Sequence, residues 1–392
     1  MNLEDLLRDT FAGMAREEEP PPPERFLRRT RQPLFAQVWR PLTAAAGVIV
    51  LIAATVLILR GTYDKPAETV AAAPGGFAPV AELWPEAVHA LPPKLPNGLD
   101  YRPELFLDAR TLLVRTGEGD APAWWTYDVR SLTVKRLVTF TPPPKTEFTS
   151  PVVEGGGRLL WYTVSWGKVK GLLDIWTVPV TGGTPRKVTS IRQTMKYGDV
   201  DYLTVVGGHA VWSRGTEGGI YRAPLTGGRP ARVPGTERLH LLQWPWAAVS
   251  TRQLGGRPGF RELVNVETGE KRDAPPGTGP CSLSWCLTRD SARPRLGGPE
   301  RALPAASIFQ AGPALDRFLV LLELMPPADK RLFLHDLKSG RTGDLGIRFQ
   351  AKVDDSTASD YMNAVTISPT TRYVLTYDLG GRRMVVNLPA IR

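Results

Sequence analysis

Histidine and cysteine, the side chains that most often carry catalysis or bind metals, are scarce in this chain. No two of its four histidines have the spacing of metal ligands. The sequence also lacks a Gly-x-Ser-x-Gly nucleophile elbow, a phosphate-binding P-loop and a Gly-x-Gly-x-x-Gly dinucleotide loop. We therefore predict a protein that is not an enzyme and holds no metal or cofactor. The histidines are His89, His209, His240 and His335.

Clustered carboxylates offer no clear site either. Asp354, Asp355 and Asp360 could supply oxygen ligands to calcium, but they lack the ordered one-three-five spacing of a calcium-binding loop. We interpret them as a solvated loop. Carboxylates that meet across a channel in the folded protein could form a hydrolase or lyase site, and such a pairing does not show in one sequence.

Long apolar runs are absent, with one exception. Residues 41–59 carry no charge and lie between Arg40 and Arg60. At ~1.5 Å per residue a helix over this run reaches about 28 Å, close to the thickness of a bilayer's hydrocarbon core. The alternatives are a cleaved signal peptide, opposed by the forty residues before it, and a buried core helix, opposed by the lack of a polar stripe. We predict a transmembrane helix over 41–59.

Positive charge is concentrated just before this run. Five arginines lie between positions 25 and 40, whereas the residues just after the run carry two basic and two acidic side chains. Because excess Lys and Arg mark the cytoplasmic side, we expect a single-pass plasma-membrane protein with its N-terminus inside and residues 60–392 outside. This topology excludes nucleic acid as a partner. The net charge of +10 lies wholly beyond residue 79. This positive charge either attracts the domain to anionic surfaces or only keeps it soluble.

The cytoplasmic segment 1–40 begins with a predicted amphipathic helix over residues 3–16. Its apolar residues recur at helical spacing, and its polar positions are acidic. A basic helix would favour the membrane surface, so an acidic one favours a cytosolic protein partner, with a passive tail as the alternative. The candidate docking face consists of Leu3, Leu6, Leu7, Phe11 and Met14.

Two segments beyond a flexible linker over 60–79 match almost residue for residue. Residues 175–188 and 220–233 are offset by 45 positions, and each contains a Thr-Gly-Gly turn. Paired glycines suit the positive-φ positions of a hairpin loop. Weaker copies follow the same plan elsewhere. The glycines of the two predicted hairpin turns are Gly182, Gly183, Gly227 and Gly228.

An apolar stretch precedes each hairpin, at seven places about 44 residues apart. Since a four-stranded propeller blade takes about 40–45 residues, we predict an all-β propeller over 80–392, with seven blades favoured over six. Trp176 and Tyr221 should then be equivalent. The last repeat shows three strands, so a strand from 80–106, with 102–107 as the candidate, should close the ring. The apolar stretches are 111–115, 159–164, 210–213, 246–250, 285–288, 318–322 and 373–377.

Cys281 and Cys286 are the only cysteines. If residues 281–286 formed one strand, the two would lie roughly 16 Å apart and could not bond. If 282–285 formed a turn, they would face each other across a hairpin. The even count and the expected oxidising compartment favour the turn and a structural disulfide.

The hairpin ending in Thr-Gly-Gly-x-Pro-x-Arg/Lys-Val resembles those of TolB-like and WD40-like propellers. The whole layout resembles the membrane-anchored propeller proteins of high-GC Gram-positive bacteria. The chain lacks the Gly-His and Trp-Asp pairs of WD40 repeats and the regular Ser-Pro-Asp-Gly turn of TolB repeats, which residues 368–371 approach most nearly. Propellers of these families serve mainly as binding platforms, so the resemblance implies a binding role.

Three functions follow from this reading. The first is a membrane-tethered binding or scaffold module for an extracytoplasmic protein or glycan. The second is a transmembrane sensor that signals through the N-terminal helix, and the third is a propeller hydrolase or lyase. The lack of catalytic motifs favours the first over the third. The second needs coupling through one helix, and residues 41–59 contain no small-xxx-small pair that would support dimerisation.

Overall fold

The computed structural model describes most of the chain from residue 76 onward. Among these residues no helix has the length and apolar character needed to cross a membrane. The predicted helices over 3–16 and 41–59, with Arg40 and Arg60, lie outside the described residues, as does the aspartate cluster at 354–360. The described ranges are 76–117, 122–166, 171–193, 200–215, 218–249, 260–276, 281–288, 290–304, 307–308, 313–323, 329–350, 366–367 and 373–392.

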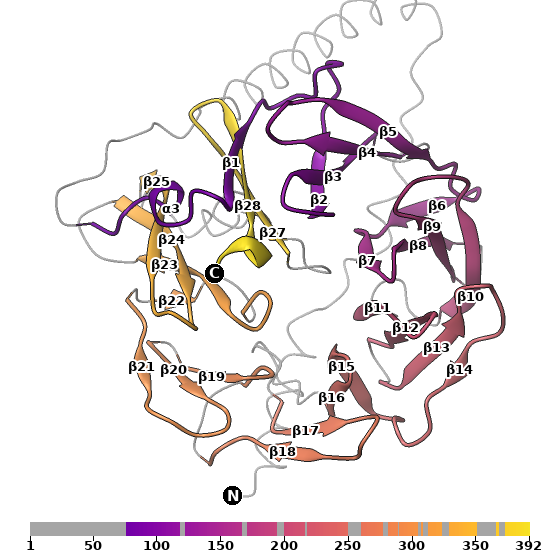
Figure 1. Cartoon of the computed structure of the whole chain (residues 1–392). Helices are drawn as coiled ribbons and strands as arrows, with labels where there is room; N and C mark the ends of the chain where they lie inside the picture. Colours follow the sequence, from indigo (N-terminus) through magenta and orange to yellow (C-terminus); the bar gives the residue numbers. More distant parts are fainter. Residues whose placement is uncertain are drawn as a thin grey trace, which may run out of the picture. The chain divides into compact units, whose positions relative to one another are not determined.

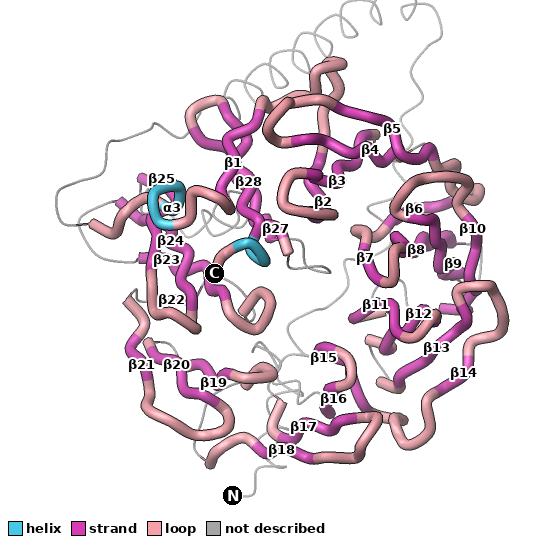
Figure 2. Tube along the Cα trace, in the orientation of Figure 1, coloured by secondary structure: helices cyan, strands magenta, loops and turns pink. Residues whose placement is uncertain are grey.

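Strand pairing produces seven antiparallel sheets, and these form the blades of a ring (Figures 1 and 2). Within a blade, successive strands are hydrogen-bonded neighbours, which short connections favour. The only helices among the described residues are short: α3 (Val80–Leu83) and the 3-10 turn η3 (Leu388–Ala390). The protein is therefore an all-β, seven-bladed propeller, and the predicted fold class is confirmed.

The longest strands of the described residues lie in blades 2 and 6. In blade 2 the innermost strand is split, because β6 and β7 both pair with the same edge of β8. Blade 1 contains β2 (Arg102–Phe106), β3 (Thr111–Thr116), β4 (Ala123–Asp128) and β5 (Val134–Thr139); blade 2 contains β6 (Thr146–Thr149), β7 (Val153–Gly155), β8 (Arg158–Trp166), β9 (Gly171–Pro179) and β10 (Arg186–Gln193); blade 3 contains β11 (Tyr202–Val206), β12 (His209–Ser213), β13 (Ile220–Pro224) and β14 (Ala231–Arg232).

Blade 5 differs from the others in having three strands among the described residues, none of them in the innermost position. Blade 4 contains β15 (Leu239–Gln243), β16 (Trp246–Val249), β17 (Glu262–Asn265) and β18 (Lys271–Asp273); blade 5 contains β19 (Trp285–Leu287), β20 (Ser291–Pro294) and β21 (Arg301–Ala302); blade 6 contains β22 (Ser307–Ile308), β23 (Phe318–Glu323), β24 (Asp329–Asp336) and β25 (Thr342–Gln350); blade 7 contains β26 (Thr366–Ile367), β27 (Val374–Leu379), β28 (Arg382–Asn387) and β1 (Val88–Leu91).

The ring closes through a strand that precedes the first blade in the sequence. β1 pairs with β28 and becomes the outermost strand of blade 7. A closing strand from 80–106 was expected and is found, but the candidate 102–107 was wrong. That stretch is β2, the innermost strand of blade 1, where Leu105 is buried against blade 2. Leu91 of β1 is instead buried between blades 7 and 1, so burial assigns the two strands to different places.

The two matching hairpins occupy equivalent positions in blades 2 and 3. Trp176 lies on β9 and Tyr221 on β13, each the third strand of its blade. Each faces a tryptophan of the second strand, Trp161 for the former and Trp212 for the latter. The predicted equivalence of Trp176 and Tyr221 is therefore confirmed. The structure places the four predicted turn glycines in the connections from the third to the fourth strand.

A third turn of the Pro-x-x-Gly-Gly kind, which the sequence analysis missed, joins β20 to β21. Gly297 and Gly298 have φ values of +92° and +131°, close to the +97° and +126° of Gly182 and Gly183. The amide of Gly297 donates to the carbonyl of Pro294 at 3.2 Å, as the first glycine does in the other two turns. The sequence pattern that predicts this turn is Pro-x-x-Gly-Gly, in which the threonine before the glycines of the other two turns is replaced by Leu296.

Buried apolar side chains fill the spaces between neighbouring blades. In the described part of the chain they form six clusters, at the junctions of blades 1–2, 2–3, 3–4, 5–6, 6–7 and 7–1. No such cluster of described residues joins blades 4 and 5. That junction is held by polar contacts, which lie beside the disulfide.

Candidate functional site

One end of the blades carries several features suited to binding. In each blade the second strand leads to the third at this end, and the innermost strand begins there, because neighbouring strands are antiparallel. We call this end the upper face. Of the six large apolar side chains that are exposed among the described residues, three lie near strand ends at this face: Phe148, Leu172 and Val249, which are 41%, 38% and 49% exposed.

A polar group lies at the same end, between blades 3 and 4. Asp201 precedes β11, Ser213 ends β12 and His240 is the second residue of β15. Asp201 accepts a short hydrogen bond from the Ser213 hydroxyl through Oδ1, and its Oδ2 lies 2.6 Å from Nδ1 of His240. The Ser213 hydroxyl also accepts the amide of Leu241 at 3.0 Å. Three side chains therefore fasten the start of two innermost strands.

The order of these three side chains does not match a hydrolytic triad. In a triad the histidine lies between serine and carboxylate, so that it can take the serine proton. Here Asp201 lies between Ser213 and His240, and Ser213 is fully buried. Ser213 therefore has no histidine next to it to take its proton, and the group acts as a link between blades.

Asp201 also affects the pKa of a side chain in a third blade. Burial and, after it, the charge of Asp201 raise the pKa of Tyr162 on β8 to about 12. The carboxylate is thus close to side chains from blades 2, 3 and 4. His240 makes no second hydrogen bond within the described structure. The histidine and carboxylate side chains are 13% and 33% exposed, so a ligand on the upper face can reach them.

A related polar link lies between blades 1 and 2. Glu104 of β2 is fully buried, and its Oε1 lies 2.9 Å from Nε of Arg115. Its Oε2 accepts the amide of Val152 at 3.1 Å, and Arg115 donates to the carbonyl of Thr149 at 3.1 Å. Burial raises the pKa of Glu104, although Arg115 opposes the rise. The partners of this buried carboxylate, Arg115 and the Val152 amide, lie inside the protein, so we assign the link a structural role.

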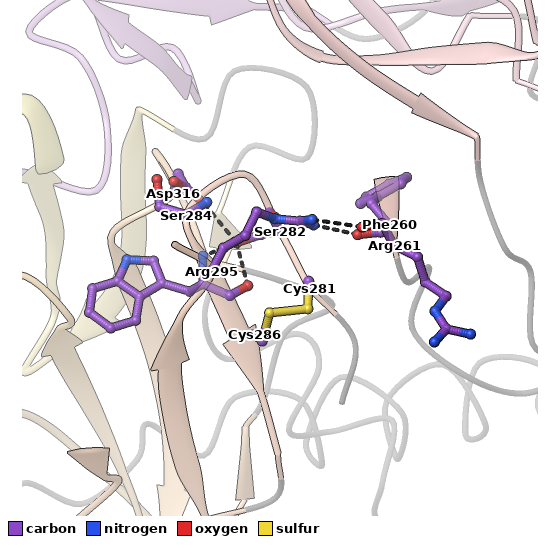
Figure 3. The surroundings of a disulfide bond; sticks show 9 residues. Phe260, Arg261, Cys281, Ser282, Ser284, Cys286, Arg295 and Asp316 are labelled. Atoms are coloured by element: carbon purple, nitrogen blue, oxygen red, sulfur yellow. Dashed lines mark hydrogen bonds between the residues drawn. A yellow bond between two sulfur atoms is a disulfide. The ribbon is translucent and has the colours of Figure 1, made fainter. Parts of the chain in front are cut away.

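The disulfide joins Cys281 to Cys286, with their Cα atoms 3.8 Å apart (Figure 3). Residues 281–286 are therefore a tight turn and not one strand, which confirms the predicted pairing. Both cysteines are buried. Cys281 pairs with Cys286 of β19 through an isolated antiparallel bridge, on the edge of β19 that faces away from β20.

Arg295 is the buried cation that joins this loop to blade 4 (Figure 3). Its side chain is among the largest fully buried ones, and the residue is only 2% exposed. The guanidinium donates to the carbonyls of Ser282 and Arg261, both at 3.0 Å, and makes a short bond to that of Phe260. Burial lowers the pKa of Arg295, with Asp316 opposing. Planar donors that point in several directions suit arginine to this place.

The other residues singled out from the sequence do not converge. His89 lies on β1, His209 bonds to its own turn, and His335 is buried against Thr342. Among the described residues no group of three His, Cys, Asp or Glu side chains is arranged to hold a metal ion. The candidate cytoplasmic docking face lies outside the described residues.

Sequence reasoning missed the residues that this geometry brings together. Asp201 and His240 are 39 positions apart, and no motif links them. Glu104 and Val152 likewise meet only across a blade junction. Arg295 had a usable signal, because it stands inside the overlooked Pro-x-x-Gly-Gly turn.

No protein-family model and no curated protein matches the sequence. Similar solved structures include TolB from Acinetobacter baumannii, at 14% identity and a TM-score of 0.31 over 64% of this chain and 54% of that one. An uncharacterized protein from Listeria monocytogenes has 8% identity and a TM-score of 0.44 over 72% and 93% of the two chains. Acylaminoacyl peptidase from Pyrococcus horikoshii has 10% identity and a TM-score of 0.42 over 68% and 47%.

This chain thus spans about half the length of that TolB structure. The similar structures include a peptidase as well as TolB, and all three have TM-scores below 0.5. The assignment as a seven-bladed propeller rests on the strand pairing of this chain.

Proposed function

We propose that this protein is a non-enzymatic binding or scaffold module, held at the outer face of the plasma membrane by a helix over residues 41–59. The uncharged run and the arginines before it support the anchor and its direction. The Cys281–Cys286 disulfide supports an extracytoplasmic location, because disulfides persist in oxidising compartments.

The upper face carries the proposed binding role. Exposed Phe148, Leu172 and Val249 lie at the same end of the blades as the reachable His240–Asp201 pair. Apolar side chains with a few fixed polar groups are the usual composition of a recognition surface. The inter-blade links hold these groups on a rigid ring. The ligand that fits is an extracytoplasmic protein or glycan with apolar patches and a group that bonds to His240.

Site-specific photo-crosslinking in intact cells tests the binding role. A photoreactive amino acid at Leu172, on the upper face, should yield a discrete crosslinked product. The control places the same amino acid at Leu296, which is 75% exposed but lies in the turn between β20 and β21, at the opposite end of the blades. Equal products at both positions, or none at Leu172, would contradict an upper-face ligand.

Protease accessibility tests the anchor separately. A protease added to intact spheroplasts should digest residues beyond 60 and leave 1–40 protected. Digestion of the N-terminal segment with protection of the propeller would show the opposite topology.

A further inference from the structure

The outermost strands of the first three blades share an unusual charge composition. Residues 129–140, 180–193 and 222–233 contain β5, β10 and β14 with the turns or strand before them. Each of these segments holds three Lys or Arg residues and no Asp or Glu. We call the three segments together the cationic rim.

Most of these cations lack an acidic partner among the described residues. Lys135, Arg192, Arg222 and Arg229 are exposed and form no ion pair in the described structure. Where partners exist, they neutralise only part of the charge. Lys187 lies 3.6 Å from Asp174, Arg232 lies 3.2 Å from Glu237 and Arg130 lies 3.7 Å from Glu86.

Direct contacts join the three segments side by side. A Cβ at Gly182, in the turn of blade 2, would come within 2.7 Å of the Leu137 carbonyl on β5. In the next blade the amide of Gly228 donates to the Val188 carbonyl on β10 at 3.2 Å. Figure 1 shows β5, β10 and β14 following one another along the outer margin of the ring. The three segments therefore form one continuous strip along the margin of the ring.

Protection of strand edges does not explain the excess of cations. Charged side chains on an outer strand, lysine especially, discourage pairing with other chains, whereas seven of the nine cations of the rim are arginines. Residues 261–273 of blade 4, which contain the outermost strand β18, hold three basic and four acidic residues. There Lys271 pairs with Glu262 at 3.2 Å and Arg272 with Glu270 at 2.8 Å. An outer strand with balanced charges is therefore sufficient to protect a blade edge in this ring. The cationic rim of blades 1–3 differs because it carries positive charge alone.

We propose that the cationic rim binds a linear polyanion that carries phosphate groups. Arginine predominates, and its planar guanidinium binds phosphate oxygens in pairs. The strip follows the convex margin of three successive blades, as Figure 1 shows. A flat bilayer would touch only a short part of a convex margin, whereas a flexible polymer can follow all three strands. The strip meets the upper face at Arg192, which pairs with Leu172, whereas Lys135 and Arg229 lie toward the opposite end of the blades.

Binding of fluorescent linear inorganic polyphosphate to the purified full-length protein, in neutral-lipid nanodiscs at low salt, tests the proposal. The triple variant Lys135→Gln, Arg222→Gln, Arg229→Gln should weaken binding by about tenfold or more, and binding should weaken steeply with added salt. The matched control Arg261→Gln, Lys271→Gln, Arg272→Gln removes the same charge from blade 4. It should change the affinity by less than about threefold.

Three outcomes would overturn the proposal. One is the absence of polyphosphate binding to the unaltered protein, and another is an equal loss in both triple variants, which would show an effect of net charge alone. The third is that the unaltered protein binds anionic vesicles but not polyphosphate, and that the rim variant abolishes this vesicle binding. Unchanged thermal unfolding midpoints establish that both variants are folded. An upper-face crosslink at Leu172 does not depend on these results, so failure here and failure of the binding role are distinguishable.

Discussion

Replacement of Arg295 by methionine should destabilise the propeller more than any other single arginine change in blade 5. The junction of blades 4 and 5 has no cluster of buried apolar side chains among the described residues, and Arg295 spans it. Its guanidinium donates to three carbonyls, those of Phe260, Arg261 and Ser282. Methionine fills most of the same volume but offers no donor.

The expected magnitude follows from two opposing terms. A hydrogen bond to a charged group contributes about 1.5–3 kcal/mol, and three carbonyls would lose their partner. Removal of a buried cation relieves its desolvation cost, which offsets part of the loss. The carbonyls stay buried in either case, so the first term is larger. We expect the free energy of unfolding to fall by about 3 kcal/mol for Arg295→Met. Lysine keeps the charge but not the planar donors, so Arg295→Lys should cost about half as much.

The measurement is denaturant unfolding of the full-length protein under non-reducing conditions, followed by tryptophan fluorescence. Arg293→Met is the matched control, since Arg293 is exposed on β20, two residues before Arg295, and it should change the free energy by less than about 0.5 kcal/mol. Combining Arg295→Met with removal of both cysteines should give a non-additive result, because Ser282 lies inside the disulfide loop. A loss for Arg295→Met no larger than that for Arg293→Met would refute this account of the junction.

Two further changes test other parts of the ring. Gly182→Ala should lower the free energy of unfolding by about 2–3 kcal/mol in the same assay, because the new Cβ would lie 2.7 Å from the Leu137 carbonyl at a φ of +97°. Gly183→Ala is the control: its Cβ would meet nothing within 4 Å, and it should cost about 1 kcal/mol. Equal losses for the two variants would contradict the close contact at Gly182. Burial lowers the pKa of His335, and the charge of Asp336 opposes this shift. Below about pH 6.5 the unfolded chain therefore binds more protons at this histidine than the folded protein does. The free energy of unfolding should fall as the pH drops from 7 to 5. His335→Gln should flatten this slope, and an unchanged slope would assign it to other groups.

The repeat architecture could be predicted from the sequence because it depends on local chemistry. A Gly-Gly turn needs two positive-φ positions wherever it occurs, so Gly182 and Gly227 mark equivalent hairpins without knowledge of the fold. A period of 45 residues then matches one four-stranded blade. The same locality made the Cys281–Cys286 pairing predictable, since the two choices differ only in whether four residues turn.

Contacts between blades were decided by the tertiary structure alone. The choice of β1 over 102–107 as the closing strand depended on which apolar residues meet at the junction of blades 7 and 1. The bond between Asp201 and His240 joins strands of different blades, and no spacing rule relates residues that only ring closure brings together. Arg295 stands where the equivalent turns have Val180 and Leu225, and only the missing apolar junction shows why blade 5 buries a cation there. Local turns follow from backbone preferences, whereas these pairings follow from the packing of one blade on the next.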